Sequence, residues 1–196
     1  MKKLLSLVIG FIFLSNLSIA QETWSVDAAH SNVRFEIGHM GLSFIDGQFK
    51  KITGNIETKD ATNFDGAVIN FDIDVQSIDT RIEARDNHLR SDDFFSAEKF
   101  PKITFKNAVL KKENGNNYSL TGDLTMKDVT KKVTFKVVQN GSVVTDQKGR
   151  SKAGFTAKTT INRTEFNFKA ADKLPSGAES IASNVDITVN VEINKK

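Results

Sequence analysis

Apolar and polar residues alternate with a period of two through most of this chain. The stretch 69–75 shows the pattern, because its odd-numbered residues are Ile, Phe, Ile and Val while its even-numbered residues are Asn or Asp. The pattern recurs at 33–39, 118–126, 133–137, 153–161 and 185–193. Successive side chains of a strand point to opposite faces, and one apolar face per strand is typical of antiparallel sheets. The alternation therefore predicts an all-β chain of about nine strands, the first at 24–28.

Paired turn residues separate several of these segments. Asp46-Gly47, Asp65-Gly66, Asn114-Gly115 and Asn140-Gly141 provide residues that accept a positive φ, which tight hairpins require. No linker or change of composition divides the chain after residue 20, so we expect one domain. Closure into a barrel would remove the exposed sheet edges, and a two-sheet sandwich is the alternative. An eight-stranded barrel would have an interior that side chains just fill or that holds one slender ligand.

One long segment, 80–105, interrupts the strand pattern. Thr80 and Glu83 have the spacing of a capping box, which predicts that a short polar helix starts here. Phe94 and Phe95 follow this helix, so we expect the segment to cover the apolar interior at one end of the sheet.

Charged residues within the helix allow two interpretations. Asp86 and Arg90 are four residues apart and are predicted to pair on the exposed face. Arg85 and Asp86 are expected to hold the segment to the rim through hydrogen bonds to backbone groups. The alternative is that Arg85 or His88 meets the polar or anionic head of a ligand.

The first twenty residues have the features of a secretory signal peptide. Met1-Lys2-Lys3 precedes an apolar run that ends at Ser18-Ile19-Ala20, a small-x-small cleavage site. We therefore expect residues 1–20 to be removed and residues 21–196 to form a periplasmic domain without a transmembrane span. Removal of Lys2 and Lys3 brings 27 basic against 24 acidic residues close to balance, which gives no indication of nucleic-acid binding. The absence of cysteine excludes thiol catalysis, c-type haem attachment and cysteine zinc sites.

Phenylalanine is unusually frequent, with 15 residues against one Trp and one Tyr. Those at 35, 71, 105, 135 and 155 share the apolar parity of their strands, whereas those at 44, 49, 94 and 95 lie near turns or the helix. Phe has no polar group, so a cavity lined by its rings would hold a long hydrocarbon by burial alone. An ordinary packed core is the alternative.

No common catalytic or phosphate-binding motif is present, since GxSxG, HExxH, GxGxxG and the P-loop are all missing. The histidines are His30, His39 and His88, and we find no carboxylate at metal-ligand spacing beside them, so we expect no metal site and no cofactor. His39 shares the inward parity of Phe35 and is either a satisfied core residue or an anchor for a ligand head group. An enzyme would use His39 or His88 as acid or base beside a carboxylate such as Asp86.

A series of short motifs runs in order along the chain. They are Trp24-Ser25-Val26-Asp27 with His30-Ser31, His39-Met40, Ser77-Ile78-Asp79-Thr80, Arg85-Asp86 with His88-Leu89, Asp93-Phe94-Phe95, Phe100-Pro101 with Ile103-Thr104-Phe105, Gly122-Asp123-Leu124-Thr125-Met126, and Asn162-Arg163 with Glu165-Phe166. Together they resemble the YceI-like family, the polyisoprenoid-binding periplasmic proteins of bacteria. The resemblance implies a single antiparallel eight-stranded lipocalin-like β-barrel that holds a long isoprenoid, with few polar contacts near its mouth.

From parity and resemblance together we expect a non-enzymatic binder of a polyisoprenoid, a prenyl quinone or a similar amphiphilic lipid, acting in transport, storage or stress protection. An enzyme and a ligand-free structural or stress protein remain the alternatives, and a homodimer is possible. The expected ligand-binding residues are Phe35, Ile37, His39, Phe49, Ile69, Phe71, Ile73, Arg85, His88, Phe94, Phe95, Phe105, Phe135 and Phe155.

Overall fold

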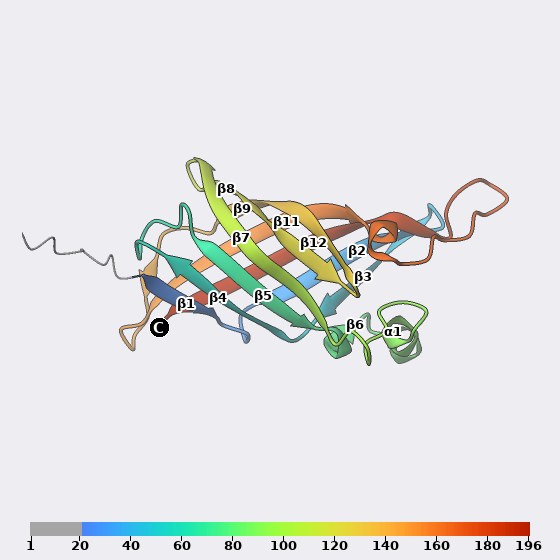
Figure 1. The fold of residues 1–196 in the computed structure, drawn as a ribbon, viewed down its shortest axis with the longest axis horizontal. Coiled ribbons are helices and arrows are strands. Elements are labelled where there is room, and N and C mark those ends of the chain that lie inside the picture. The colour runs from blue at the N-terminus through green and yellow to red at the C-terminus, as the bar shows by residue number, and fades with distance from the viewer. Residues whose placement is uncertain (1–20) are drawn as a thin grey trace, which may run out of the picture.

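The computed structural model describes residues 21–196, and the predicted signal peptide lies outside the described residues. Within these described residues, one antiparallel sheet closes on itself, with one α-helix beside one end (Figure 1). The elements are β1 (Glu22–Val26), β2 (Asn32–His39), β3 (Ser43–Phe49), β4 (Ile52–Thr58), β5 (Val68–Asp74), β6 (Ile78–Asp79), α1 (Glu83–Arg90), β7 (Lys102–Asn114), β8 (Asn117–Met126), β9 (Val129–Gln139), β10 (Val144–Thr145), β11 (Ser151–Asn162) and β12 (Ile181–Lys195), with short 3₁₀ turns at Val75–Ser77 and Arg163–Phe166.

The wall of the barrel has eight strand positions. β1 and β2 both pair with β12, one after the other, and together form one interrupted line that occupies a single strand position. β4 pairs with β1 and β3 pairs with β2, so β3 and β4 together occupy the next position. The order then continues through β5, β7, β8, β9 and β11, and β11 pairs with β12 along its whole length to close the ring. The predicted eight-stranded antiparallel barrel is confirmed, and the sandwich alternative is wrong.

Three of the four expected turn pairs are at turns, where Gly66, Gly115 and Gly141 have φ of +77°, +52° and +84°. The prediction for Asp46-Gly47 is wrong, because both residues lie inside β3. The β2–β3 hairpin instead turns at Met40-Gly41, where both residues have positive φ. Gly47 pairs with Phe35 of β2, and the Phe35 ring occupies the space that a side chain at residue 47 would need.

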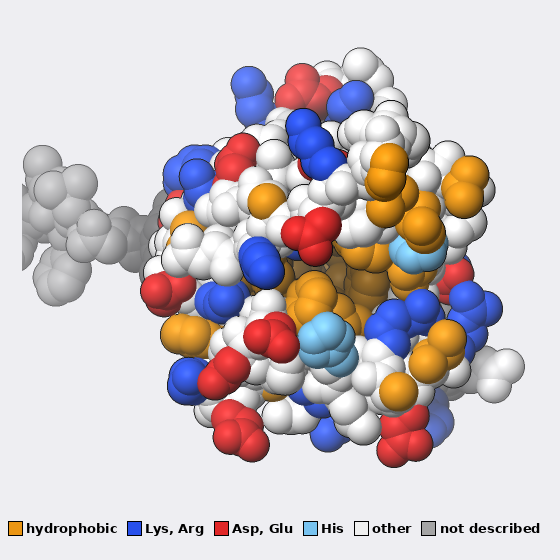
Figure 2. Space-filling model, turned by 90° about the vertical axis from the view of Figure 1, so that its right-hand side faces the viewer, with side chains coloured by type: hydrophobic (Ala, Val, Ile, Leu, Met, Phe, Trp, Pro, Cys, Tyr) orange, Lys and Arg blue, Asp and Glu red, His pale blue; other side chains and the backbone are white. Residues whose placement is uncertain are grey.

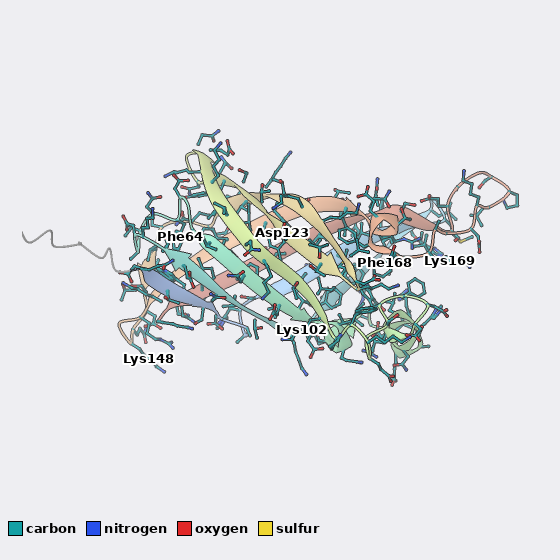
Figure 3. The ribbon with its side chains drawn as sticks, in the orientation of Figure 1. Phe64, Lys102, Asp123, Lys148, Phe168 and Lys169 are labelled. Carbon is teal, nitrogen blue, oxygen red and sulfur yellow. The ribbon has the colours of Figure 1, made fainter. Side chains whose placement is uncertain are left out.

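The two ends of the barrel differ. At the end where β1 begins, the rings of Trp24 and Phe64 are 5.3 Å apart and fully buried, and Phe64 contacts Phe155 edge-on at 5.0 Å. Phe64 lies at this end and Phe168 near the opposite end, beside which α1 lies (Figure 3). These buried aromatic rings therefore fill the interior at the Trp24 end of the barrel. None of the helices among residues 21–196 has both the length and the apolar character needed to cross a membrane.

Candidate ligand cavity

The end of the barrel beside α1 contains a cavity of about 400 Å³, here called the mouth cavity. Figure 2 shows this end of the molecule, with hydrophobic side chains lining a central hollow. Residues of α1 and of the segment after it cover one side of the cavity. The lining residues are Val33, Phe35, Ile37, Ile45, Phe49, Ile52, Phe71, Ile73, Thr80, Arg85, His88, Leu89, Phe94, Phe95, Ile103, Phe105, Leu124, Met126, Phe135, Ile161, Arg163, Phe168, Ile181, Val185, Ile187 and Val189.

Each of the eight wall positions contributes at least one side chain to the mouth cavity, from β2 and β3 round to β11 and β12.

Most of the residues expected from the sequence lie on this cavity. They are Phe35, Ile37, Phe49, Phe71, Ile73, Arg85, His88, Phe94, Phe95, Phe105 and Phe135. Ile69 and Phe155 instead line a second void of about 50 Å³, here called the inner cavity, which lies toward Phe64. His39 lines neither cavity, because it is the last residue of β2 and pairs with Ser43 and Ile181 at the rim.

The segment after α1 places two rings on the mouth cavity. Phe95 contacts Phe49 edge-on at 5.8 Å and Phe168 at 4.9 Å, so it joins the barrel wall to the loop after the second 3₁₀ turn. Phe94 contacts the imidazole of His88 at 4.9 Å. These contacts form a roof of aromatic rings over one side of the cavity.

Asp86 anchors α1 to the barrel. One of its carboxylate oxygens accepts hydrogen bonds from Thr80 N at 2.8 Å and from Thr80 Oγ1 at 2.6 Å. The guanidinium of Arg85 donates to Thr80 Oγ1 at 2.7 Å and to the Thr80 carbonyl at 2.8 Å. The expected hydrogen bonds of Arg85 and Asp86 with backbone groups are present, and both are made with Thr80, which directly follows β6.

The predicted capping box is wrong. Ile82 is the N-cap residue of α1 and makes no side-chain capping bond, since the fully buried Thr80 directs its hydroxyl to Asp86. Arg81 between them has φ +68°, and this turn places Thr80 outside the helix.

The predicted Asp86–Arg90 pair is also wrong. Asp86 is buried, whereas Arg90 donates to the carbonyls of Gln76 at 3.1 Å and Ile78 at 2.9 Å. Arg90 therefore fastens the C-terminal end of α1 to the 3₁₀ turn and β6, whereas Arg85 and Asp86 fasten its first turn to Thr80, the residue after β6.

The family of the chain follows from comparison of its whole length. The YceI-like domain pattern matches residues 24–193. The chain belongs to the YceI-like family. It is 36% identical over 193 residues to a UPF0312 protein of Photorhabdus laumondii, covering 97% of this chain and 96% of the relative. It is also 36% identical over 195 residues to protein YceI of Escherichia coli, with 97% and 96% covered.

Solved structures of YceI-like and related proteins have the same barrel. BcnA of Burkholderia cenocepacia matches with a TM-score of 0.68 and 25% identity, over 85% of this chain and 98% of that one. The YCEI protein of Campylobacter jejuni matches with a TM-score of 0.66 and 28% identity, over 82% and 90%. A polyisoprenoid binding domain from Saccharophagus degradans has a TM-score of 0.60 at 15% identity, which establishes a common fold.

Among the cavity residues of this YceI-like barrel that the sequence analysis missed, Arg163 and Phe168 lie outside the strands. Arg163 begins the second 3₁₀ turn, is buried, and donates to the carbonyls of Ala182 at 3.0 Å and Lys169 at 2.7 Å. Burial lowers the pKa of its guanidinium, and the carboxylate of Glu179 opposes this effect. Phe168 follows on the same segment, outside any strand, so no alternation identified it. The Asn162-Arg163 motif was the one available signal.

His88 has a carboxylate neighbour other than the one expected. Its Nε2 lies 3.4 Å from Asp93 Oδ2, and both side chains are more than half exposed. Asp86 is bonded to Thr80 instead. An acid–base pair of His88 with Asp86, which the enzyme alternative considered, is therefore not what the structure shows.

A cluster of ionisable groups lies near the Trp24 end of the barrel. Asp27, His30 and Glu192 each offer one potential ligand atom within 4.8 Å of the others, so the expectation that no carboxylate lies beside the histidines is wrong. Lys152 Nζ lies between the two acids, 2.6 Å from Glu192 and 3.3 Å from Asp27. The ammonium group already provides the positive charge that this cluster requires.

The same contacts shift the ionisation of the cluster. The hydrogen bond with His30, together with those from Asn194 and Lys152, holds the pKa of the Asp27 carboxyl well below its usual range. Glu192 and then Asp27 raise the pKa of Lys152. The cluster fastens the interrupted line β1–β2 to β11 and β12 by charge.

Proposed function

We propose that this chain is an exported binding protein that holds one long-chain apolar ligand in the mouth cavity without catalysing a reaction. The ligand class is a polyisoprenoid, a prenyl quinone or a similar amphiphilic lipid. The observation that carries the proposal is a cavity of about 400 Å³ inside a closed barrel, with walls made almost wholly of hydrocarbon. Cavities of about 300–1,000 Å³ are usual for small-molecule sites.

The two arginines on the cavity are engaged in holding the fold. Arg85 is bonded to Thr80, and Arg163 is bonded to the carbonyls of Ala182 and Lys169. An apolar ligand would therefore bind by burial, at about 25 cal/mol per Å² of apolar surface, with its polar head at the rim near His88. This arrangement supports binding rather than chemistry.

Membership of the YceI-like family also supports a lipid ligand. The barrel shared with a polyisoprenoid binding domain at 15% identity supports the fold alone, so the choice of ligand class depends on the cavity. Transport, storage and stress protection are each compatible with a protein that takes up one lipid.

Native mass spectrometry tests the proposal. The full chain, purified from the periplasm of its own cells without detergent, is expected to carry an apolar adduct that organic extraction removes. A ligand-free mass, combined with no uptake of added geranylgeraniol, would contradict the proposal.

Export is tested separately. We expect residues 1–20 to direct the chain to the periplasm and the purified protein to begin at Gln21. Sequencing of the N-terminus and cell fractionation measure this, and an intact Met1 in the cytoplasmic fraction would refute export without affecting ligand binding.

A further inference from the structure

The mouth cavity and the inner cavity share part of their walls. Phe71, Phe105, Phe135 and Val189 line both, and we call these four residues the partition. They come from β5, β7, β9 and β12. The partition is therefore made by side chains from several sides of the barrel, at the level where the two cavities meet. Beyond it lies the inner cavity of about 50 Å³, and Phe64 is among its lining residues.

The partition rings are held in place by their neighbours. Phe105 and Phe135 contact each other edge-on with centroids 5.3 Å apart, and both are buried. Phe71 lies over Gly54, its partner on β4, so closely that a Cβ atom there would be 2.1 Å from its ring. Side chains packed in this way hold their positions on average.

The inner cavity is apolar throughout. Its lining includes Ile56, Leu110, Phe155 and Ile193 and contains no polar side chain. Apolar voids stay free of water, so hydrocarbon is the occupant that such a space favours. At about 50 Å³ it would accept only a short extension of a chain that reached it.

We propose that the partition is the floor of the ligand site and sets the longest apolar chain that the protein holds fully buried. The inner cavity then lies behind this floor and joins the site only when a partition ring is cut back. This inference rests on the proposed function, and it adds the feature that determines which chain lengths are preferred.

A homologous series of unbranched primary alcohols, bound to the full mature protein, measures the limit. Each methylene that enters the site is expected to raise affinity about fourfold, the equivalent of about 0.8 kcal/mol. In the wild type this gain should stop at the chain length that reaches the partition. In Phe135→Ala the gain should continue to longer members of the series.

Phe64→Ala is the matched control, because it removes another buried ring, one that lines only the inner cavity. Its limit should equal that of the wild type, since the partition remains. Phe135→Leu and Phe64→Leu provide the same comparison if either alanine variant fails to fold, and thermal unfolding checks all four variants.

The outcomes separate the two proposals. Binding with the same limit in the wild type and the Phe135 variants would overturn the partition alone. A limit that lengthens equally in the Phe64 variants would also overturn it, because ligand would then already reach the inner cavity. No binding of any alcohol by the wild type would overturn the proposed function and the partition with it.

Discussion

The ring of Phe35 lies on Gly47, its partner on the neighbouring strand. A Cβ atom at residue 47 would be 2.3 Å from Phe35 Cζ and 2.9 Å from Thr80 Cγ2. The glycine thus gives space both to a ring on the mouth cavity and to the residue that anchors α1. Phe71 and Gly54 have the same relationship on β5 and β4.

Replacement of Gly47 tests this packing. Gly47→Ala should lower the free energy of unfolding by about 1–3 kcal/mol, because Phe35 or Thr80 must move to admit the methyl group. Gly154→Ala is the control, since a Cβ atom there meets nothing closer than 3.6 Å. Chemical denaturation measures both, and equal stabilities of the two variants would contradict the argument.

The Asp86–Thr80 contact leads to a second prediction. Asp86→Ala leaves the buried Thr80 N–H and hydroxyl without their acceptor and should cost about 1–3 kcal/mol. Amide hydrogen exchange should speed up in residues 80–95 more than in the barrel strands. Asp93→Asn, which alters an exposed carboxylate, should change stability by less than about 1 kcal/mol. Similar losses in both variants would count against the anchoring role.

Filling the mouth cavity should block binding without harming the barrel. Ile45 lines the cavity, whereas Phe44 beside it on β3 is 70% exposed. Ile45→Trp is expected to weaken binding of geranylgeraniol at least about tenfold, or about 1.4 kcal/mol, because the indole takes up space the ligand needs. Phe44→Trp should bind as the wild type does. Titration calorimetry measures both affinities, and unchanged binding by Ile45→Trp would refute the assignment of this cavity.

The Asp27 cluster predicts a pH dependence of stability. Because the folded state lowers the pKa of Asp27 below its ordinary 3.8, ionisation of this carboxyl stabilises the fold above about pH 4. That contribution is lost as the pH falls below this value through the folded-state pKa.

Asp27→Asn should therefore be less stable than the wild type at pH 7, by about 1.5–3 kcal/mol for the lost charged hydrogen bonds, and the difference should shrink on acidification. Asp46→Asn, which removes one exposed partner of Arg81, should show a small difference at either pH. Urea denaturation at pH 7 and below about pH 4 measures these stabilities. The same stability difference between Asp27→Asn and the wild type at both pH values would disprove the linkage.

The barrel and most of its lining could be predicted because strand geometry fixes which way each side chain points. Once residues 33–37 and 69–73 were assigned to strands, parity determined that Phe35, Ile37, Phe71 and Ile73 would share the interior face. The depth of each residue along the barrel axis depends on register, which alternation does not reveal. Phe155 and Ile69 were therefore expected in one cavity with Phe35 but lie on the inner cavity.

The errors have a common physical origin in competition for the same group. Asp46-Gly47 has the composition of a turn, but Phe35 requires the glycine within a strand. Thr80 has the spacing of a helix cap, but a buried carboxylate six residues later binds its hydroxyl. In each case a contact outside the short local motif outweighed the local preference. Phe168 gave no periodic signal at all.

The tilted contact between the rings of Trp24 and Phe64 has a consequence for exchange of the proposed ligand. Because these two buried rings fill the far end, a ligand held as proposed would enter and leave at the end beside α1. The barrel would then have a single opening, so a second ligand molecule could enter only after the first had left.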